Sequence, residues 1–294
     1  MPELPEVETV RAGLVPFVEG AHIDHVTLYR ANLRFAFPEK FVERLTGRTI
    51  VQAGRRAKYL LFKLDDGQVM LSHLGMTGSY RFIEKQILEP TRYREPKKGK
   101  HDHIEFELTH PKHGKLHLIY ADPRRFGFVD LFPSEDDSPY LRDLGPEPLG
   151  NDFNAGFLAD RFAGKKAPIK AGLLDQRLIA GLGNIYVSEA LHRAHILPDT
   201  TCGALVTKAG RPSKRLEDLT TAIRTVLTEA IEVGGSTLRD FRKADGTSGY
   251  FQHSFAVYDR EGEPCPTPLC TGTIERIVQS GRSSFFCPVC QHGG

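Results

Sequence analysis

Four of the five cysteines lie in the last thirty residues of this 294-residue chain, with the spacing C-x4-C-x16-C-x2-C at Cys265, Cys270, Cys287 and Cys290. Four thiolates complete the tetrahedral shell of a structural zinc ion and leave no open position for a water molecule. Redox or disulfide use is the alternative interpretation of clustered cysteines. The spacing favours one structural Zn2+, which would supply folding energy to a tail too short to bury much apolar surface.

Basic residues are the second group whose types and spacing could do chemistry. One cluster comprises Arg55, Arg56 and Lys58, and the range 92–100 contains five more basic residues, whereas the range 135–160 is acidic. The net charge of +2 and the pI of about 8.2 are too mild to establish a nucleic-acid partner. Such clusters can contact phosphate or can be solvated faces, so both interpretations stay open at this point.

Composition limits the class of protein. Apolar residues make up 40% and charged residues 26% of the chain, which is ordinary for a soluble globular protein. No window has the length of uncharged apolar sequence that a bilayer span requires. The N-terminus carries acid and has no basic segment, which argues against a signal peptide. We therefore predict a cytoplasmic protein without a membrane partner.

The elements that must position these residues are helical first and β-rich next. Apolar residues recur at helical spacing over residues 3–19. Pro2 and Pro5 suit the first turn of such a helix. Short strands separated by turn residues are expected at 50–51, 59–64, 69–71, 104–108, 116–120 and 128–132. This spacing predicts an N-terminal helix with an antiparallel β-sandwich or barrel, within an α+β chain.

The second half of the chain has helical patterning. A linker is expected at 133–150, where proline, glycine and acidic residues gather. An amphipathic stripe follows at 216–231 and ends at Gly234-Gly235. We predict a β domain over 1–132, a helical domain over 151–249 and a zinc finger over 250–294, the last with a hairpin tip at 279–282.

Several motifs occur together in order. They are Met-Pro-Glu-Leu-Pro-Glu-Val-Glu-Thr-Val at 1–10, Gly-Arg-Arg-Ala-Lys-Tyr-Leu-Leu at 54–61, His-Leu-Gly-Met-Thr-Gly-Ser at 73–79, Asp-Pro-Arg-Arg-Phe-Gly at 122–127, Leu-Gly-Pro-Glu-Pro-Leu at 144–149 and Gly-Leu-Gly-Asn-Ile-Tyr at 181–186. With the cysteine tail, the chain resembles the formamidopyrimidine-DNA glycosylase family over its whole length. The resemblance implies a helix-two-turn-helix in the helical domain and a base-excision repair enzyme that acts on DNA.

The resemblance makes Pro2, Glu3 and Glu6 catalytic candidates. Removal of Met1 would expose Pro2 as a secondary amine, whose attack on the sugar C1′ gives an iminium that stays cationic without a further proton. Glu3 could protonate the ring oxygen if burial raises its pKa. Glu6 matches the family's second essential carboxylate. The alternative is that Pro2 and Glu3 only begin a helix.

Other site residues are implied by matching position. Lys58, expected on a strand, resembles a phosphate contact with a proton role in β-elimination, and Asn184 resembles a phosphate contact at a helix start. Arg282 at the hairpin tip resembles the arginine that assists the second elimination. His101 and Lys165 resemble further phosphate contacts. For these residues the alternatives are a solvated side chain or, for Asn184, a helix cap.

Met76, Arg124 and Phe126 resemble the trio that fills the duplex when a damaged base is flipped out. Extrusion of a base leaves a hole and an orphaned partner, which a thioether, a guanidinium and an aromatic ring are suited to fill. Without the resemblance, Met76 and Phe126 would more often be core residues. The glycine-rich segment 234–250 is expected to form a lid over the flipped base.

The resemblance therefore implies a bifunctional DNA glycosylase and abasic-site lyase for oxidised purines, such as 8-oxoguanine and formamidopyrimidines opposite cytosine. Its partner would be double-stranded DNA with an oxidised base or abasic site, bound by a monomer. The alternatives are an endonuclease VIII-like glycosylase for oxidised pyrimidines and a non-catalytic damaged-DNA-binding protein. One departure is the four-residue spacing of Cys265 and Cys270, where the family commonly has two residues.

Overall fold

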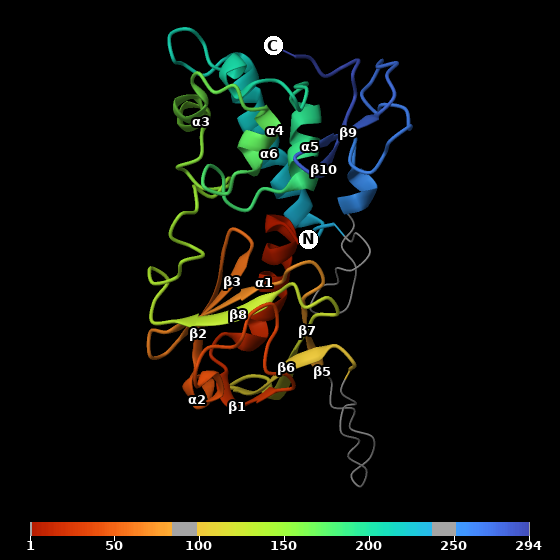
Figure 1. The fold of residues 1–294 in the computed structure, drawn as a ribbon. Helices are drawn as coiled ribbons and strands as arrows, with labels where there is room; N and C mark the ends of the chain where they lie inside the picture. The colour runs from red at the N-terminus through yellow and green to blue at the C-terminus, as the bar shows by residue number, and fades with distance from the viewer. Residues whose placement is uncertain (1, 84–98, 237–250, 294) are drawn as a thin grey trace. The chain divides into compact units, whose positions relative to one another are not determined.

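The computed structural model describes residues 2–83, 99–236 and 251–293 (Figure 1). The chain forms two compact units, Met1–Arg142 with Gly234–Gly249, and Asp143–Val233 with Tyr250–Gly294. The predicted domain boundaries at 132, 150 and 249 stay predictions. Most of the predicted lid, from 237 to 250, lies outside the described residues.

In the described residues of the first unit, one long helix accompanies two antiparallel sheets of four strands. The helix is α1 (Leu4–Val18), with a short helix α2 (Phe41–Leu45). One sheet has the order β1-β6-β7-β5, and its strands are His22–Leu28, Asp102–His110, Gly114–Ala121 and Ser79–Ile83. The other has the order β2-β3-β4-β8, and its strands are Ile50–Arg56, Tyr59–Leu64, Val69–His73 and Phe128–Phe132. The predicted helix and sandwich are confirmed, whereas β1 and β5 were not expected.

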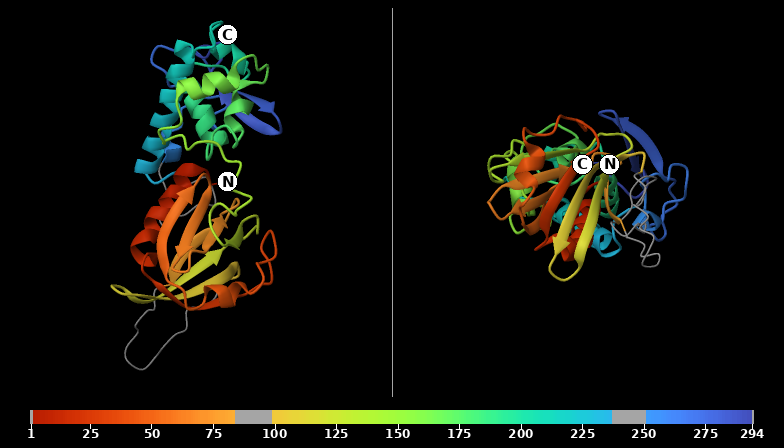
Figure 2. Two further views of the ribbon diagram at one scale, coloured as in Figure 1. Left: turned by 90° about the vertical axis from the view of Figure 1, so that its left-hand side faces the viewer. Right: turned by 90° about the horizontal axis from the view of Figure 1, so that it is seen from below.

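The core of this unit joins the helix to both sheets. Val7, Val10 and Leu14 recur on one face of α1 and are buried together with Phe62 of β3 and Phe106 of β6. Each such side chain stabilises the fold by roughly 1.5–3 kcal/mol through burial. The helix runs beside β2 and β3 (Figures 1 and 2). The helix α1 is thereby attached to β2 and β3, whose connecting turn contains Lys58.

The second unit is helical and ends in a two-stranded hairpin. Its elements are α3 (Ala155–Phe162), α4 (Ile169–Leu174), α5 (Asn184–Arg193), η1 (Cys202–Leu205), α6 (Lys214–Glu232), η2 (Phe251–Ser254), β9 (Glu275–Gln279) and β10 (Arg282–Phe286). The predicted stripe is the buried face of α6, whose first turn is capped by the Ser213 side chain accepting from Leu216 N–H. The helical domain and the zinc-finger hairpin are confirmed.

The hairpin turn is tighter than predicted. Only Ser280 and Gly281 form it, with φ of 49° and 75°, while Gln279 and Arg282 are the last paired residues of the strands. Positive φ at both central residues is the geometry of a two-residue turn that matches the twist of the strands. Arg282 is therefore anchored by its own backbone pairing.

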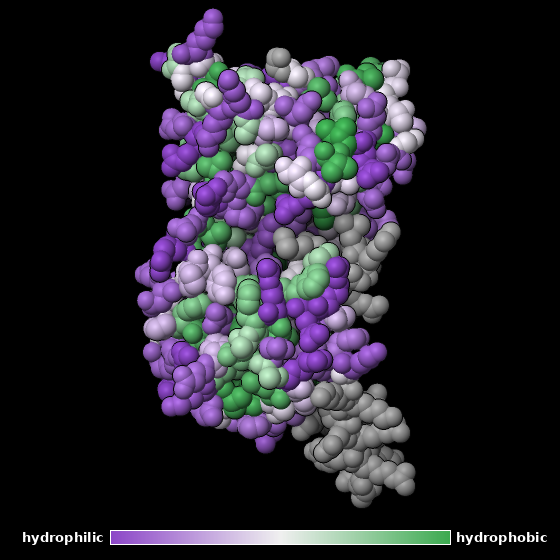
Figure 3. Space-filling model, in the orientation of Figure 1, coloured by the Kyte–Doolittle hydropathy of each residue, from purple (hydrophilic) through white to green (hydrophobic). Residues whose placement is uncertain are grey.

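Polar residues dominate the visible surface. Hydrophilic side chains cover most of the face in Figure 3, with apolar residues in smaller patches. Among the described helices, none combines the length and the apolar character needed to cross a membrane.

Candidate active site and zinc centre

The first turn of α1 buries the proposed nucleophile and both carboxylates. Pro2 is buried, and Glu3 and Glu6 are only 4% and 2% exposed. Glu3 is the residue before the helix, and its backbone N–H donates to Glu6 Oε2 at 2.8 Å. This bond is one of the two reciprocal bonds of a capping box. It gives the Glu3 N–H the acceptor that a helix start otherwise lacks. Pro2 therefore lies at the positive end of the helix dipole.

Glu6 is also held from a distant part of the sequence. Its Oε1 accepts hydrogen bonds from Ser236 N at 2.8 Å and Ser236 Oγ at 2.9 Å. Gly235 approaches so closely, with φ of +75°, that an added Cβ would lie 3.1 Å from Glu6 Oε1. The Glu6 carboxylate thus joins the start of α1 to the first residues of the 234–250 segment. The sequence predicted Glu6 as a catalytic candidate but did not indicate Ser236 as its partner.

Lys58 does not lie on a strand as predicted. It occupies the two-residue turn between β2 and β3, next to Ala57 with φ of 52°, and its side chain is 7% exposed. Arg55 donates to Ala57 O at 2.9 Å and to Glu8 Oε2 at 3.0 Å. Glu8 belongs to α1, so these bonds attach the Lys58 turn to the helix that carries Glu3.

The ion pairs of Glu8 are strong enough to affect its titration. Burial opposes the charged carboxylate, but the hydrogen bonds and charges of Arg11 and Arg55 outweigh it and lower the Glu8 pKa below its ordinary value. Glu8 therefore stays ionised at neutral pH and keeps both arginines bound.

His73 was not predicted as a site residue, but it ends β4, the strand that leads into the Met76 loop. It stacks on the Phe128 ring at 5.4 Å, and its Nδ1 accepts from Gly75 N–H at 3.1 Å. Burial, followed by the positive charge of Lys58, lowers the His73 pKa to about 4. The ring is therefore neutral at neutral pH. Its position as the first residue of the 73–79 motif was the available signal.

The predicted trio of Met76, Arg124 and Phe126, here called the wedge residues, lies at the surface. Met76 is 38% and Phe126 44% exposed, unusual for large apolar side chains, and Arg124 stacks over the Phe126 ring at 4.6 Å. They belong to the β4–β5 and β7–β8 loops. His101, also exposed, lies just before β6.

In the second unit, Asn184 is bonded to the strand that begins at Arg282. Asn184, the first residue of α5, donates from Nδ2 to Ser283 O at 3.0 Å, and Ser283 follows Arg282 in β10. Lys170, which is 2% exposed and was not predicted, donates to the same oxygen at 2.8 Å. Lys165 is exposed after α3, and its carbonyl accepts from Gly203 N–H at 2.9 Å.

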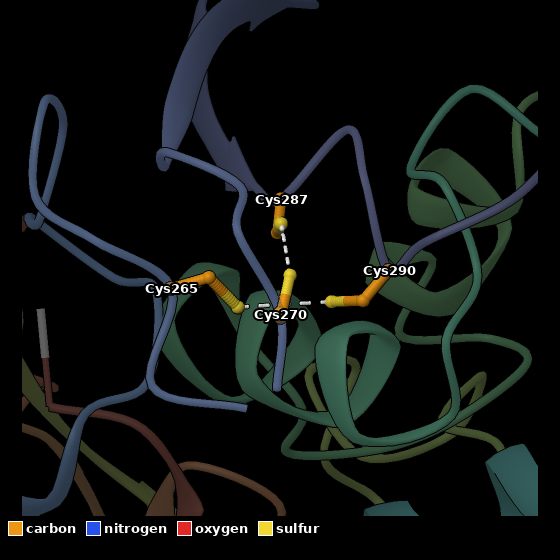
Figure 4. A group of neighbouring side chains, drawn as sticks. All are labelled: Cys265, Cys270, Cys287 and Cys290. Atoms are coloured by element: carbon orange, nitrogen blue, oxygen red, sulfur yellow. Dashed lines mark hydrogen bonds between the residues drawn. The ribbon is translucent and has the colours of Figure 1, made fainter. Parts of the chain in front are cut away.

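The four predicted zinc ligands converge (Figure 4). All four sulfur atoms lie within 4.8 Å of one another, with Cys265 and Cys290 Sγ 3.7 Å apart and Cys270 and Cys287 Sγ 3.6 Å apart. Tetrahedral Zn–S bonds of about 2.3 Å place sulfur atoms about 3.8 Å apart. The set fits one zinc ion. A closed four-thiolate shell gives that ion a structural role.

The four-residue spacer between Cys265 and Cys270 brings further polar groups close to these sulfur atoms. Thr267 Oγ1, inside the four-residue spacer, lies 3.4 Å from Cys265 Sγ and 3.7 Å from Cys290 Sγ. His192 Nε2 of α5 lies 3.2 Å from Thr267 Oγ1 and 3.5 Å from Cys265 Sγ. Hydrogen bonds to metal-bound thiolates orient them, so the extra residues extend the site without opening it.

Comparisons with known proteins cover nearly the whole chain. Three family models match, described as the formamidopyrimidine-DNA glycosylase N-terminal domain at residues 1–129, the formamidopyrimidine-DNA glycosylase H2TH domain at 144–242, and a zinc finger found in FPG and IleRS at 262–293. Formamidopyrimidine-DNA glycosylases of Rhizobium leguminosarum bv. trifolii and Allorhizobium ampelinum are 54% and 55% identical, each over 99% of this chain and all of their own length.

Solved structures with the same fold include DNA complexes. A Lactococcus lactis FPG variant with Fapy-dG-containing DNA has a TM-score of 0.85 at 35% identity, over 99% of this chain and all of that one. The Lactococcus lactis enzyme with abasic-site DNA and with oxidised-pyrimidine DNA gives 0.83 at 34% identity in both cases, over the same shares.

Proposed function

The chain belongs to the formamidopyrimidine-DNA glycosylase family and is a DNA glycosylase and abasic-site lyase that excises oxidised purines, and we propose that Pro2 is its nucleophile. The observation that carries this proposal is the burial of Pro2 beside Glu3 at the first turn of α1. A secondary amine next to a buried carboxyl group is suited to attack at C1′ with proton transfer. The helix dipole favours the neutral, nucleophilic amine.

The first half of the reaction follows from these two groups. The Pro2 nitrogen, freed by removal of Met1, bonds to C1′ as the C1′–N9 bond breaks, and the proton that this nitrogen then gives up passes to the departing base. Glu3 then gives a proton to O4′, the C1′–O4′ bond opens, and the nitrogen lone pair forms the iminium. Glu6, held by Ser236 and the Glu3 backbone, orients the first turn.

The second half is strand cleavage. The iminium withdraws electrons, so loss of a C2′ proton expels the 3′ phosphate, and a second elimination expels the 5′ phosphate. We assign phosphate contacts to Lys58, His101, Lys165 and Asn184, and assistance of the second elimination to Arg282. Cationic groups and helix-start N–H groups both bind phosphate oxygens.

The wedge residues are assigned to the duplex. Their exposure on two neighbouring loops suits insertion at the position that a flipped base leaves. We propose that the partner is double-stranded DNA with an oxidised base or an abasic site, bound by a monomer in the cytoplasm. The Lactococcus lactis structures, which hold Fapy-dG and abasic-site DNA, support this substrate class.

Borohydride trapping on a duplex with one 8-oxoguanine opposite cytosine tests the proposal. An adduct mapped to Pro2 is expected, together with loss of the adduct in Pro2→Gly. If protein with a verified Pro2 N-terminus gives no adduct, the nucleophile is wrong and the non-catalytic alternative gains support. A parallel duplex with an oxidised pyrimidine is informative because one Lactococcus lactis structure holds such DNA. Faster excision there would favour the endonuclease VIII-like alternative.

A further inference from the structure

Two loops of the first unit meet at a buried carboxylate. Asp122, at the end of β7, is 0% exposed. Its Oδ1 accepts from Thr77 Oγ1 and its Oδ2 accepts from Gly127 N–H at 2.8 Å. Thr77 belongs to the β4–β5 loop and Gly127 to the β7–β8 loop. One carboxylate therefore holds both loops.

Thr77 completes the connection. Its hydroxyl donates to Asp122 and accepts from Arg124 N–H at 3.1 Å. Every wedge residue is thus next to this network, since Met76 precedes Thr77, Arg124 donates to Thr77, and Phe126 precedes Gly127. The loops are also in close contact, because a Cβ added at Gly75 would lie 2.3 Å from Gly127 N. The backbone under the wedge is held at three points.

We propose that Asp122 and Thr77 are positioning residues that hold the three wedge residues in place before DNA binds. Neither side chain reaches the surface, since Thr77 is 6% and Asp122 0% exposed, so they act through the wedge. Ordering two loops only when DNA binds would add their conformational entropy to the cost of extruding a base. A wedge that is already ordered avoids that addition. The inference rests on the proposed role of the wedge residues.

The test compares a substrate that needs the wedge with one that does not. The first is a duplex with 8-oxoguanine opposite cytosine, where a base must be extruded. The second is a single strand with a preformed abasic site, where no base pair has to be opened. Single-turnover rates on both are measured for Thr77→Val, which keeps the shape and removes the hydroxyl, and for Thr77→Ser, which keeps the hydroxyl.

Thr77→Val is expected to slow excision from the duplex about tenfold, the effect of one to two lost hydrogen bonds. Its cleavage of the single-stranded abasic site should stay within about twofold of the wild type. Thr77→Ser should restore duplex excision. Equal slowing of both substrates would mean a general structural role and would overturn the inference. So would an unchanged duplex rate.

Two further variants keep the test decisive. Thr109→Val removes an exposed Thr–Asp hydrogen bond near the end of β6, where Thr109 donates to Asp24 far from the wedge residues in sequence, and should change neither rate. Should Thr77→Val fail to fold by circular dichroism, Asp122→Asn, which keeps the shape of the side chain but replaces one accepting oxygen with an amide nitrogen, carries the same expectation. An unchanged duplex rate in a folded Asp122→Asn would then overturn the inference.

Phe126→Ala distinguishes a failure of this inference from a failure of the proposed wedge role. If Phe126→Ala leaves duplex excision unchanged, the wedge role itself fails and the inference fails with it. If Phe126→Ala slows duplex excision and Thr77→Val does not, only the inference fails. In the Phe126→Ala background, Thr77→Val should add less than its effect alone, because residues acting through one another are not additive. Full additivity would show that Thr77 acts by another route.

Discussion

The start of α1 and the zinc hairpin hold the side chains of the proposed site in place by different means. Around α1, an extensive apolar cluster joins the helix to both sheets, and the buried Glu6 carboxylate is held by the Glu3 and Ser236 backbone donors. Around Arg282, the corresponding cluster has five buried residues, Val257, Cys265, Ile274, Phe285 and Cys287, and two of them are zinc ligands. The first region depends on burial, and the second depends on its metal.

This difference has a functional reason in the proposed chemistry. A proton donor such as Glu3 needs a site from which water is largely excluded, which a large core provides. An arginine that contacts phosphate must stay exposed and ionised, so it needs a firm base without burial, and a metal-held hairpin provides this. The two regions should therefore respond to different perturbations.

Loss of zinc is the perturbation with the largest expected effect. Structural zinc contributes roughly 10–16 kcal/mol to the folding of small metal-held units, and the cluster around Cys287 is too small to replace it. Cys287→Ser should therefore lose zinc, unfold β9 and β10, and abolish tight DNA binding, while the first unit keeps its cooperative unfolding. Zinc content, limited proteolysis and DNA binding measure these outcomes.

Cys202→Ser is the matched control for the zinc prediction. Cys202 is buried but is not one of the four zinc ligands. Its Sγ lies 3.7 Å from Pro168 O. This variant should keep one zinc per chain and normal binding. If the β9–β10 hairpin of Cys287→Ser stays resistant to proteolysis, the hairpin does not depend on metal. The two regions would then not differ in what stabilises them.

Glu3→Gln should have the next largest effect, confined to the first region. The amide keeps the shape of the side chain but cannot supply the proton, and removal of a general acid typically slows a reaction about 10²- to 10⁴-fold. Base excision should fall by that factor, while lesion affinity and zinc content stay near wild type. Excision that survives in Glu3→Gln would show that Glu3 is not the acid.

The elements were predictable from sequence where the periodicity was clear. The stripe of α6 and most strands carried the expected patterns, and the cysteine spacing identified the metal ligands. Strand β1 was missed because its exposed polar residues interrupt the alternation. Lys58 was misplaced because its turn, Ala57-Lys58, lacks the glycine or asparagine that usually marks a two-residue hairpin.

The polar partners in the site could not be predicted from sequence. Glu6 and Ser236 are separated by 230 residues, and the Thr77–Asp122 bond by 45. Such contacts depend on how the elements pack, which no local pattern encodes. His73 was visible as a residue type, but its neutral state depends on burial and on the charge of Lys58.

Ser236→Ala tests how far the first region depends on single hydrogen bonds. It removes the Ser236 Oγ bond to Glu6 Oε1 and leaves the backbone bond in place. We expect a loss of excision of about tenfold, the effect of one bond to a charged group. Ser236→Thr keeps the hydroxyl and should stay close to wild type. If the two variants lose equal activity, the bulk at position 236 matters and the hydroxyl does not.

The smallest expected effect is a pH dependence of the first region through His73. Its pKa is about 4 in the folded protein and 6.5 in the unfolded chain, because burial and Lys58 disfavour the charged ring. As the pH falls below 6.5, the unfolded chain takes up the proton first, so folding loses stability until the pH passes the folded pKa. Between pH 7 and pH 6 this amounts to about 0.7 kcal/mol. The difference in unfolding free energy between wild type and His73→Gln should change by that amount over this pH range. Parallel behaviour of His73→Gln would mean that the folded protein does not hold the ring neutral.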